Sequence, residues 1–346
     1  MRKIRIEPRF NWKQKVEEYG LCFHTTEGRP YWDESAYYEF TESEIDMLEE
    51  CTAELQDMCM TAAQYIIDYD LFAELRIPPA AVPVIKRSWA ERELSLYGRF
   101  DLAYDGINPP KLLEYNADTP TALLEAGVAQ WEWMQEIHPS ADQFNSIHDK
   151  LVIRWAEMRR RLLDGPLYFC HLDNDEDTVT TSYLRETAHQ AGIRETSFLL
   201  MQEIGWNEET NTFRDLEEAL MSNVFKLYPW EWLIDEFPAK LLETYFEMRW
   251  IEPIWKMMWS NKGLLAVLWR IFPRHRLLLE TYIGTPHTMQ NYVKKPLFSR
   301  EGANVTIHTS GGEYGTGGEY GAEGFVFQEL APLRDFGGGY PVVGSW

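Results

Sequence analysis

The chain has 346 residues, 45% of them hydrophobic and 25% charged, which is the balance of a folded globular protein. Because a single core rarely extends beyond about 250–300 residues, we expect two or three lobes. The chain has 33 basic and 55 acidic residues, which gives a net charge of -22. This charge argues against nucleic acids and anionic membranes as partners. A phosphate-bearing ligand would therefore need a local basic pocket.

The beginning of the chain and its cysteines indicate a cytoplasmic protein. The first ten residues, MRKIRIEPRF, lack the apolar core of a signal peptide. The sequence also contains no stretch of about 18 apolar residues, the length that a membrane-spanning helix requires. The four cysteines have no metal-type spacing, so we predict reduced, buried thiols at Cys22, Cys51, Cys59 and Cys170. The histidines show no HxH or HExxH pattern, and we predict no zinc site.

The first part of the chain predicts helices around a hairpin. Apolar residues recur at three- and four-residue steps over 41–70, which predicts one or two amphipathic helices. Residues 96–104 and 111–116 have the pattern of short strands, and the segment between them, Asp-Gly-Ile-Asn-Pro-Pro, is dense in turn formers. We therefore expect a β-hairpin there. A helical pattern begins at Ala122 and includes Trp131 and Trp133, and a second one covers 144–163.

The middle of the chain has a strand, helix, strand pattern. A buried-strand run at 167–170 precedes a helix at 177–191 that ends at Gly192, and an apolar run follows at 196–201. This spacing predicts a small parallel α/β lobe. Residues 206–259 are rich in Trp and are predicted to be helical.

The last part of the chain is predicted to be mostly strands. An apolar helix at 264–269 runs up to Pro273, and the strand-like segments that follow are 292–297, 303–308, 324–330 and 340–343. Glycine-dense turns separate them. The sequence Gly-Gly-Glu-Tyr-Gly occurs at 311–315 and again at 317–321, which we interpret as a duplicated mobile loop.

The hairpin carries the most informative side chains. If Tyr104 pairs with Lys111, opposed residue numbers sum to 215, so Asp101 faces Glu114 and Arg99 faces Asn116, all on one side of the sheet. Two opposed carboxylates repel each other by several tenths of a kcal/mol or more, and a cation between them removes that penalty. These oxygen ligands suit Mg²⁺ at a nucleotide site. The alternative is a solvated face whose carboxylates pair with Arg99 and other basic residues.

A glycine-containing turn between two of the last predicted strands is a candidate phosphate-binding segment. Residues 298–304 follow Lys295, and their backbone N–H groups together with Arg300 could cover phosphates that Lys295 neutralises. The alternative is a plain hairpin whose basic residues discourage edge pairing.

The residues around these two places resemble a known family, the glutathionylspermidine synthetases and their bacterial single-domain relatives. Blocks in the family's order extend over nearly the whole chain. They are YGRFD (97–101), LEYNADTPT (113–121), EAG (125–127), EPIW (252–255), SNK (260–262), LW (268–269), FP (272–273), KPLFSREGAN (295–304), QEL (328–330) and GSW (344–346).

This resemblance implies an α+β fold of the ATP-grasp ligase type, with mixed and antiparallel sheets and a small Rossmann-like, pre-ATP-grasp α/β lobe. The implied parts are a helical region with the metal-binding hairpin (1–164), the α/β lobe (165–258) and the nucleotide-binding ATP-grasp lobe (259–346). Family members continue beyond Trp346 with another strand and a further arginine at the phosphates, so we expect the last lobe to be truncated here.

The resemblance also implies a reaction and its residues. ATP would phosphorylate a substrate carboxylate, and an amine would displace phosphate to form an amide, with ATP and Mg²⁺ as cofactors. Arg99 is the implied catalytic residue at the transferring phosphate, and the implied magnesium ligands are Asp101, Glu114 and Asn116. The implied ATP-binding residues are Arg99, Lys262, Lys295, Ser299, Arg300, Gly302, Gln328, Glu329 and Leu330. The implied substrate-binding residues are Asp118, Thr119, Thr121 and Glu176.

The identity of the two substrates stays open. Ala122 stands where the family has a cysteine in its acid-binding loop, and residues 119–121 are Thr-Pro-Thr, which argues against glutathione as the acid. We expect a small-molecule or peptide carboxylate and an amine, for which a polyamine-like cation is one candidate because the chain is acidic. Glu176 has an alternative role in a solvated loop before a helix capped by Asp177. A catalytically inactive ATP-grasp scaffold that binds nucleotide or peptide is the alternative function.

Overall fold

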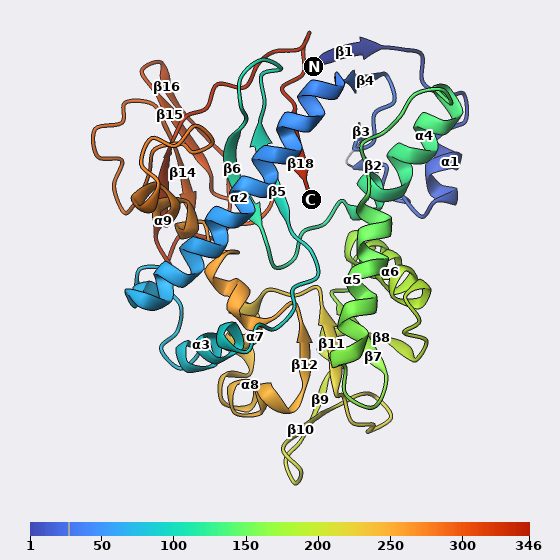
Figure 1. Ribbon diagram of the computed structural model, residues 1–346, viewed down its shortest axis with the longest axis vertical. Coiled ribbons are helices and arrows are strands. Elements are labelled where there is room, and N and C mark those ends of the chain that lie inside the picture. The colour runs from blue at the N-terminus through green and yellow to red at the C-terminus, as the bar shows by residue number, and fades with distance from the viewer. Residues whose placement is uncertain (27) are drawn as a thin grey trace.

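The protein combines helices with several separate sheets (Figure 1). The computed structural model describes residues 1–26 and 28–346. The α-helices of the described part are α1 (Trp12–Glu18), α2 (Glu42–Asp68), α3 (Val82–Ala90), α4 (Gln130–Ile137), α5 (Ile147–Met158), α6 (Asp175–Gln190), α7 (Trp230–Glu236), α8 (Pro238–Thr244) and α9 (Gly263–Ile271).

The strands of the described part are mostly short. They are β1 (Arg2–Arg5), β2 (Thr25–Thr26), β3 (Arg29–Pro30), β4 (Ala36–Glu39), β5 (Arg99–Ala103), β6 (Lys111–Asn116), β7 (Leu167–His171), β8 (Thr196–Leu200), β9 (Gly205–Asn207), β10 (Thr212–Arg214), β11 (Asn223–Lys226), β12 (Arg249–Ile251), β13 (Thr281–Ile283), β14 (Tyr292–Pro296), β15 (Thr306–Thr309), β16 (Gly312–Gly315), β17 (Phe325–Glu329) and β18 (Val342–Ser345).

The predicted N-terminal amphipathic segment is one helix, α2. Its first turn is closed by a capping box, in which the Thr41 side chain accepts from the Glu44 N–H and the Glu44 carboxylate accepts from the Thr41 N–H. The apolar stripe of α2 is buried, and the helix packs against α9 (Figure 1). The spacing of apolar residues thus fixed both the existence of this helix and its buried face.

The predicted parallel lobe is confirmed, and it is larger than the sequence indicated. Strand order is β12-β11-β7-β8 with every pair parallel, and α6 connects β7 to β8. The prediction of an all-helical segment over 206–259 is wrong, because β9, β10, β11 and β12 lie within it. Strands β11 and β12 have only four and three residues, which is too short for periodicity to separate strand from helix. The cap of α6 is Asn174, not Asp177.

The last part of the chain forms an antiparallel sheet in the order β13-β17-β14-β15-β16. The predicted strands near 292, 303 and 324 are confirmed, whereas β13 and β16 were not predicted. The first Gly-Gly-Glu-Tyr-Gly segment is mostly strand β16, which pairs with β15, so its interpretation as a loop was wrong. This sheet packs against α9.

The hairpin β5–β6 belongs to a three-stranded sheet ordered β18-β5-β6, in which β5 is the central strand. Arg99 pairs with Asn116 and Asp101 with Glu114, as the turn predicted. Closer to the turn the predicted pairing of Tyr104 with Lys111 is wrong: Lys111 pairs with Ala103, because Leu113 is an extra residue between the Asp101–Glu114 and Leu102–Leu112 pairs. Such β-bulges redirect nearby groups and are common beside active sites. Strand β18 pairs with β5, so the end of the chain contacts the hairpin rather than the antiparallel sheet.

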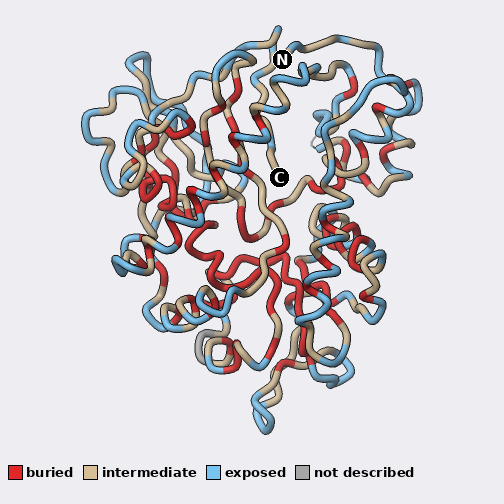
Figure 2. The backbone as a smooth tube through the Cα atoms, viewed as in Figure 1, coloured by how far each residue is buried: buried red, intermediate tan, exposed pale blue. Residues whose placement is uncertain are grey.

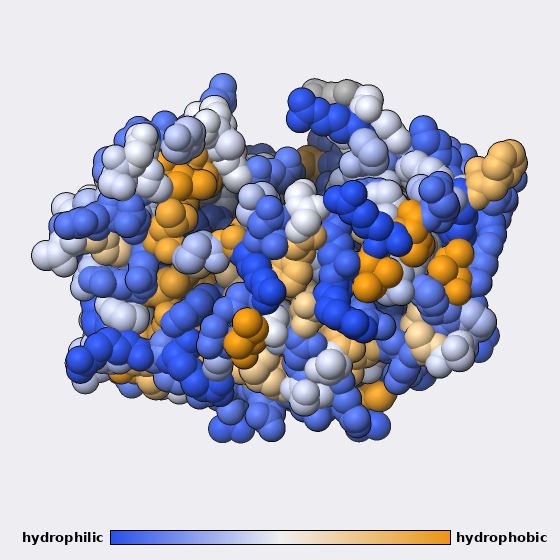
Figure 3. All heavy atoms as spheres, turned by 90° about the horizontal axis from the view of Figure 1, so that it is seen from above, coloured by the Kyte–Doolittle hydropathy of each residue, from blue (hydrophilic) through white to orange (hydrophobic). Residues whose placement is uncertain are grey.

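Two buried clusters stabilise this arrangement. The larger cluster joins α2, the hairpin, the Trp-rich segment and α9, and the smaller one joins α5, α6 and β7. Buried residues concentrate where the parallel sheet meets the base of the hairpin (Figure 2). Seen from above, the surface is mostly hydrophilic, with separate hydrophobic patches (Figure 3). In the part of the chain described here, no helix combines the length and apolarity that crossing a membrane requires.

Candidate functional site

One face of the hairpin brings the predicted catalytic and metal-binding residues together. Arg99 binds Asp101 with two donors, Nε to Oδ1 at 2.6 Å and Nη2 to Oδ2 at 3.1 Å. Asn116 Nδ2 donates to Asp101 Oδ2 at 3.1 Å and to Glu114 Oε1 at 3.2 Å. The two carboxylates thus converge on one point. All four side chains point to one face because residues two apart on a strand share a side.

Two lysines from the antiparallel lobe reach this face. Lys262, just before α9, lies 3.2 Å from Glu114 Oε2 and donates to the Ser299 carbonyl at 2.6 Å. Lys295, on β14, donates to the Leu113 carbonyl at 2.9 Å and to Gln328 Oε1 at 2.6 Å. The bulge residue Leu113 therefore presents its carbonyl to a predicted ATP-binding lysine. This contact connects the hairpin to the antiparallel sheet.

The charges on this face shift the pKa values of its side chains in opposite directions. Burial raises the pKa of Asp101, and the Arg99 guanidinium opposes that effect while Glu114 adds to it. Burial also acts to raise the pKa of Glu114, but the ammonium groups of Lys262 and Lys295 outweigh it and lower that pKa to about 2. Burial lowers the pKa of Lys295 to about 8, against the pull of Glu114. Glu114 is therefore a permanent anion between two cations.

The oxygen atoms on this face fit a magnesium ion. Among the residues described by the structure, no three or more His, Cys, Asp or Glu gather in a metal-binding group. The candidate set is instead two carboxylates and one amide, and Mg²⁺ commonly combines one or two carboxylates with water and phosphate oxygens. The Asn116 amide now donates to both carboxylates, and turning it over would offer Oδ1 instead, because an amide carries a donor and an acceptor side by side.

Arg300 connects three parts of the chain. Its guanidinium donates to the Thr119 hydroxyl, after the hairpin, and through Nη2 to Glu231 Oε1 on α7 at 3.1 Å. Among the described residues, none accepts a hydrogen bond from its buried Nε, whereas buried donors normally have partners. Glu231 had no predicted role, and no sequence motif pointed to it.

Asp118 is the predicted substrate residue that lies deepest. It is 1% exposed, its Oδ1 accepts from Lys226 Nζ at 2.7 Å, and its Oδ2 accepts from the Trp230 N–H at 3.1 Å. Both carboxylate oxygens are thus bound inside the protein. A direct contact between Asp118 and the acid substrate stays a prediction.

A second group of predicted and unpredicted residues surrounds Arg99. The Thr121 carbonyl accepts from Arg99 Nη1 at 2.8 Å. Glu176 lies in the first turn of α6. Burial is the main cause of the raised pKa values of Tyr31 and Glu125, and the negative charge of Glu176 raises both further. The Tyr31 hydroxyl donates to Glu125 Oε1 at 2.6 Å. Glu125 opens a π-helical turn, Glu125–Ala129, a feature that often marks functional sites.

The remaining predicted residues lie along the antiparallel sheet. Ser299 is almost fully buried, and Gln328 donates to the Leu112 carbonyl at 3.1 Å. Gly302 has a φ of 69° in the turn between β14 and β15, a conformation that glycine adopts without strain. Glu329 ends β17, and the N–H of Leu330 donates to the Asn291 carbonyl at 3.2 Å. Recognition of adenine by residues 329–330 stays a prediction.

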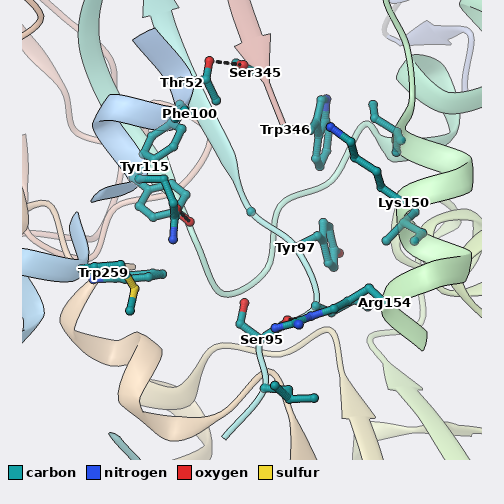
Figure 4. Close-up of a pocket in the computed structure, with 18 of the residues that line it drawn as sticks. Thr52, Ser95, Tyr97, Phe100, Tyr115, Lys150, Arg154, Trp259, Ser345 and Trp346 are labelled. Atoms are coloured by element: carbon teal, nitrogen blue, oxygen red, sulfur yellow. Dashed lines mark hydrogen bonds between the residues drawn. The ribbon is translucent and has the colours of Figure 1, made fainter. Parts of the chain in front are cut away.

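Two pockets lie beside the hairpin, and Tyr115 lines both of them. The smaller one, about 20 Å³, is lined by Asn116, Asp118, Thr119, Lys262, Ser299 and Arg300, all of them predicted site residues, together with four neighbours. The larger one, about 1050 Å³, lies behind the hairpin and contacts Phe100 and Tyr115. Figure 4 shows Tyr97, Lys150, Arg154, Trp259 and Trp346 around it. None of the predicted site residues lines this larger pocket.

The chain is similar to known proteins over most of its length. A family model described as "Glutathionylspermidine synthase preATP-grasp" matches residues 3–346. A Haemophilus influenzae protein named "Putative acid--amine ligase" is 39% identical over 338 residues, covering 93% of this chain and 85% of that protein.

Larger relatives match over part of their length. Trypanothione synthetase of Crithidia fasciculata is 27% identical over 85% of this chain, and the bifunctional glutathionylspermidine synthetase/amidase of Escherichia coli is 29% identical over 78%. The match covers 49% and 48% of these two enzymes. A glutathione synthetase-like effector from Globodera pallida has a similar fold, with a TM-score of 0.51 at 10% identity, covering 92% of this chain and 80% of that one. The chain therefore belongs to the glutathionylspermidine synthase family.

Proposed function

We propose that the protein is an ATP-dependent carboxylate–amine ligase that forms an amide through an acyl phosphate. The observation that carries this proposal is the hairpin face, where Asp101 and Glu114 converge beside Arg99, Lys262 and Lys295. In a chain of net charge -22, such a concentration of cations points to a polyanionic ligand. Phosphoryl transfer depends mainly on positioning and on charge stabilisation of this kind.

The proposed reaction has two steps. A carboxylate oxygen of the acid attacks the γ-phosphorus of ATP, and ADP leaves with the electrons of the broken P–O bond. The amine nitrogen then attacks the acyl carbon, phosphate leaves, and the amine loses one proton as the amide forms. Arg99 stabilises charge at the transferring group, and Lys262 and Lys295 neutralise ATP. Asp101, Glu114 and Asn116 would hold Mg²⁺, which supplies further charge neutralisation at the phosphates.

The acid substrate enters beside Arg300 and Thr119 in this proposal. No acceptor for the buried Nε of Arg300 lies in the part of the chain that the structure describes, and a guanidinium binds carboxylates and phosphates through directed donors. Gly302 lies in the turn that follows Arg300, where its backbone can approach a phosphate closely. Residues 328–330 border adenine. The division into parts at 164 and 258, the ATP-grasp assignment and a cytoplasmic location belong to the same proposal.

The amine binds near Glu125 and Glu176 in this proposal. Glu125 is 7% exposed, and burial together with the charge of Glu176 raises its pKa. Two carboxylates that disfavour each other's charge are relieved by a cation placed between them. A polyamine-like substrate with an ammonium group fits this requirement, and the acidic surface favours its approach at low ionic strength.

The test is ATP turnover, monitored by mass spectrometry, against mixtures of acids and amines. We expect ADP and a condensed product only when an acid and an amine are both present, and no product with Asp101→Asn or Glu114→Gln. Asp105→Asn is the matched control, because Asp105 lies in the turn of the same hairpin and its carboxylate accepts hydrogen bonds from Ile107 and Asn108 of that turn. ATP binding without turnover over the whole panel would support the inactive scaffold, and absence of ATP and Mg²⁺ binding would contradict both functions.

A further inference from the structure

Four charged side chains lie fully buried beneath the hairpin. Lys226 ends β11, Glu252 follows β12, and Lys256 lies one turn further along the chain; all three are 0% exposed, and Asp118 is 1% exposed. The lysines pair with the carboxylates, Lys226 with Asp118 and Lys256 with Glu252, each at 2.7 Å. Buried ion pairs are costly to form and often stabilise less than apolar residues of the same size. Their presence here therefore suggests a role beyond stability.

The pair Lys256–Glu252 holds the beginning of the hairpin by its backbone. Both carboxylate oxygens of Glu252 accept from the Leu96 N–H at 3.0 Å, and Oε1 also accepts from the Tyr97 N–H at 3.0 Å. Lys256 Nζ donates to the Tyr97 carbonyl. Since Tyr97 is two residues before Arg99, this contact fixes where β5 begins.

The same ammonium group also holds the other end of the hairpin. Lys256 Nζ donates to the Ala117 carbonyl at 2.5 Å, and Ala117 directly follows Asn116, the last residue of β6. One nitrogen atom thus joins the two strands at the end where Arg99 and Asn116 face each other. The turn holds the opposite end of the hairpin.

We propose that Lys256 and Glu252 are positioning residues, which fix the separation of β5 and β6 and thereby keep Arg99 and Asn116 at the correct distance from Asp101 and Glu114. This inference rests on the proposed function, because it assigns these residues to the same site. Neither Lys256 nor Glu252 is among the residues predicted to contact ATP, Mg²⁺ or the substrates. A misplacement of about 1 Å at a reacting group can reduce turnover about 100-fold.

The chain offers a control with similar burial and no contact with the hairpin. Arg9 and Glu34 form an ion pair at 2.5 Å with side chains 3% and 1% exposed, and their other partners are Trp32 and Glu136. Replacing either member of a buried pair leaves an uncompensated charge. Arg9→Met therefore also removes the cation of a buried pair, and urea unfolding shows how its loss of stability compares with that of Lys256→Met.

The experiment compares Lys256→Met, Lys256→Arg and Arg9→Met in the full chain. The readouts are amide hydrogen exchange in residues 99–103 and 111–116, the Mg²⁺ concentration for half-maximal ATP binding by calorimetry, and urea unfolding. We expect Lys256→Met to raise that concentration at least tenfold and to speed exchange in both strands at least tenfold. Arg9→Met should change both by less than twofold at a comparable loss of stability, and Lys256→Arg should recover part of the effect.

Equal changes in Lys256→Met and Arg9→Met would overturn the proposal, because they would show a general loss of stability. Unchanged exchange in the hairpin of a folded Lys256→Met would overturn it as well. If Lys256→Met does not fold, Glu252→Gln gives the same test, because its single amide oxygen can still accept from Leu96 and Tyr97 while the negative charge that pairs with Lys256 is lost. Hydrogen exchange needs no turnover, so failure of the proposed function would be seen separately as wild-type protein that does not convert ATP.

Discussion

The replacement Glu114→Gln tests the electrostatics of the site directly. Lys262 and Lys295 lower the pKa of Glu114 from its ordinary value of 4.5 to about 2. At 1.36 kcal/mol for each pKa unit, this difference corresponds to about 3.4 kcal/mol in favour of the charged carboxylate. Because 29% of the side chain is exposed, solvent screens part of this interaction. We therefore expect a loss of about 2–3 kcal/mol in the free energy of unfolding at pH 7.

The contribution of Glu114 to the free energy of unfolding should depend on pH. A depressed carboxylate pKa stabilises the folded state above pH 4.5, and that stabilisation is lost as the pH falls through 2. The difference between wild type and Glu114→Gln should thus shrink between pH 7 and pH 3. Loss of a magnesium ligand should also reduce Mg²⁺-dependent ATP binding at least tenfold.

The assay is urea unfolding at pH 7 and pH 3, with calorimetric titration of ATP in the presence of Mg²⁺. Glu54→Gln serves as the control, since Glu54 pairs with Arg276 and His275 at the surface, where an ion pair is worth about 1 kcal/mol or less. Glu114→Gln with unchanged stability and full ATP binding would refute the reasoning. A stability difference that stays constant with pH would show that the lysines do not act on this carboxylate.

Three further outcomes follow from individual contacts. Burial lowers the pKa of Lys295 to about 8, so kcat/KM for ATP should fall as the pH rises through 8. The cost of burying its charge should also decrease above pH 8. Lys295→Arg should make kcat/KM less dependent on pH in this range. Thr41→Ala removes the capping box with Glu44 and should lower stability by about 1 kcal/mol in urea unfolding. Lys226→Met leaves the buried carboxylate of Asp118 unpaired and should cost about 3–5 kcal/mol, and adding Asp118→Asn should restore most of that loss.

Much of the hairpin could be predicted from local sequence. The turn formers at 105–110 placed Asp101 opposite Glu114, and the structure confirms that pairing. The bulge at Leu113 could not be predicted, because it depends on Lys295 and on the antiparallel sheet that approaches from the far end of the chain. Glu231 and Glu125 were missed as site residues for the same reason, since their partners Arg300 and Tyr31 lie 69 and 94 residues away in sequence.

The sequence by itself determined the elements whose signals are local. The apolar period and the Thr41 cap defined α2, turn residues defined the hairpin, and the family blocks identified the chemistry. Only the tertiary structure decided which strands β11 and β12 would join, where Lys256 would place its ammonium group, and that β18 would pair with β5. The physical reason is that a buried charge or a short strand such as β11 is defined by its long-range partners. No periodicity within a few residues encodes those partners.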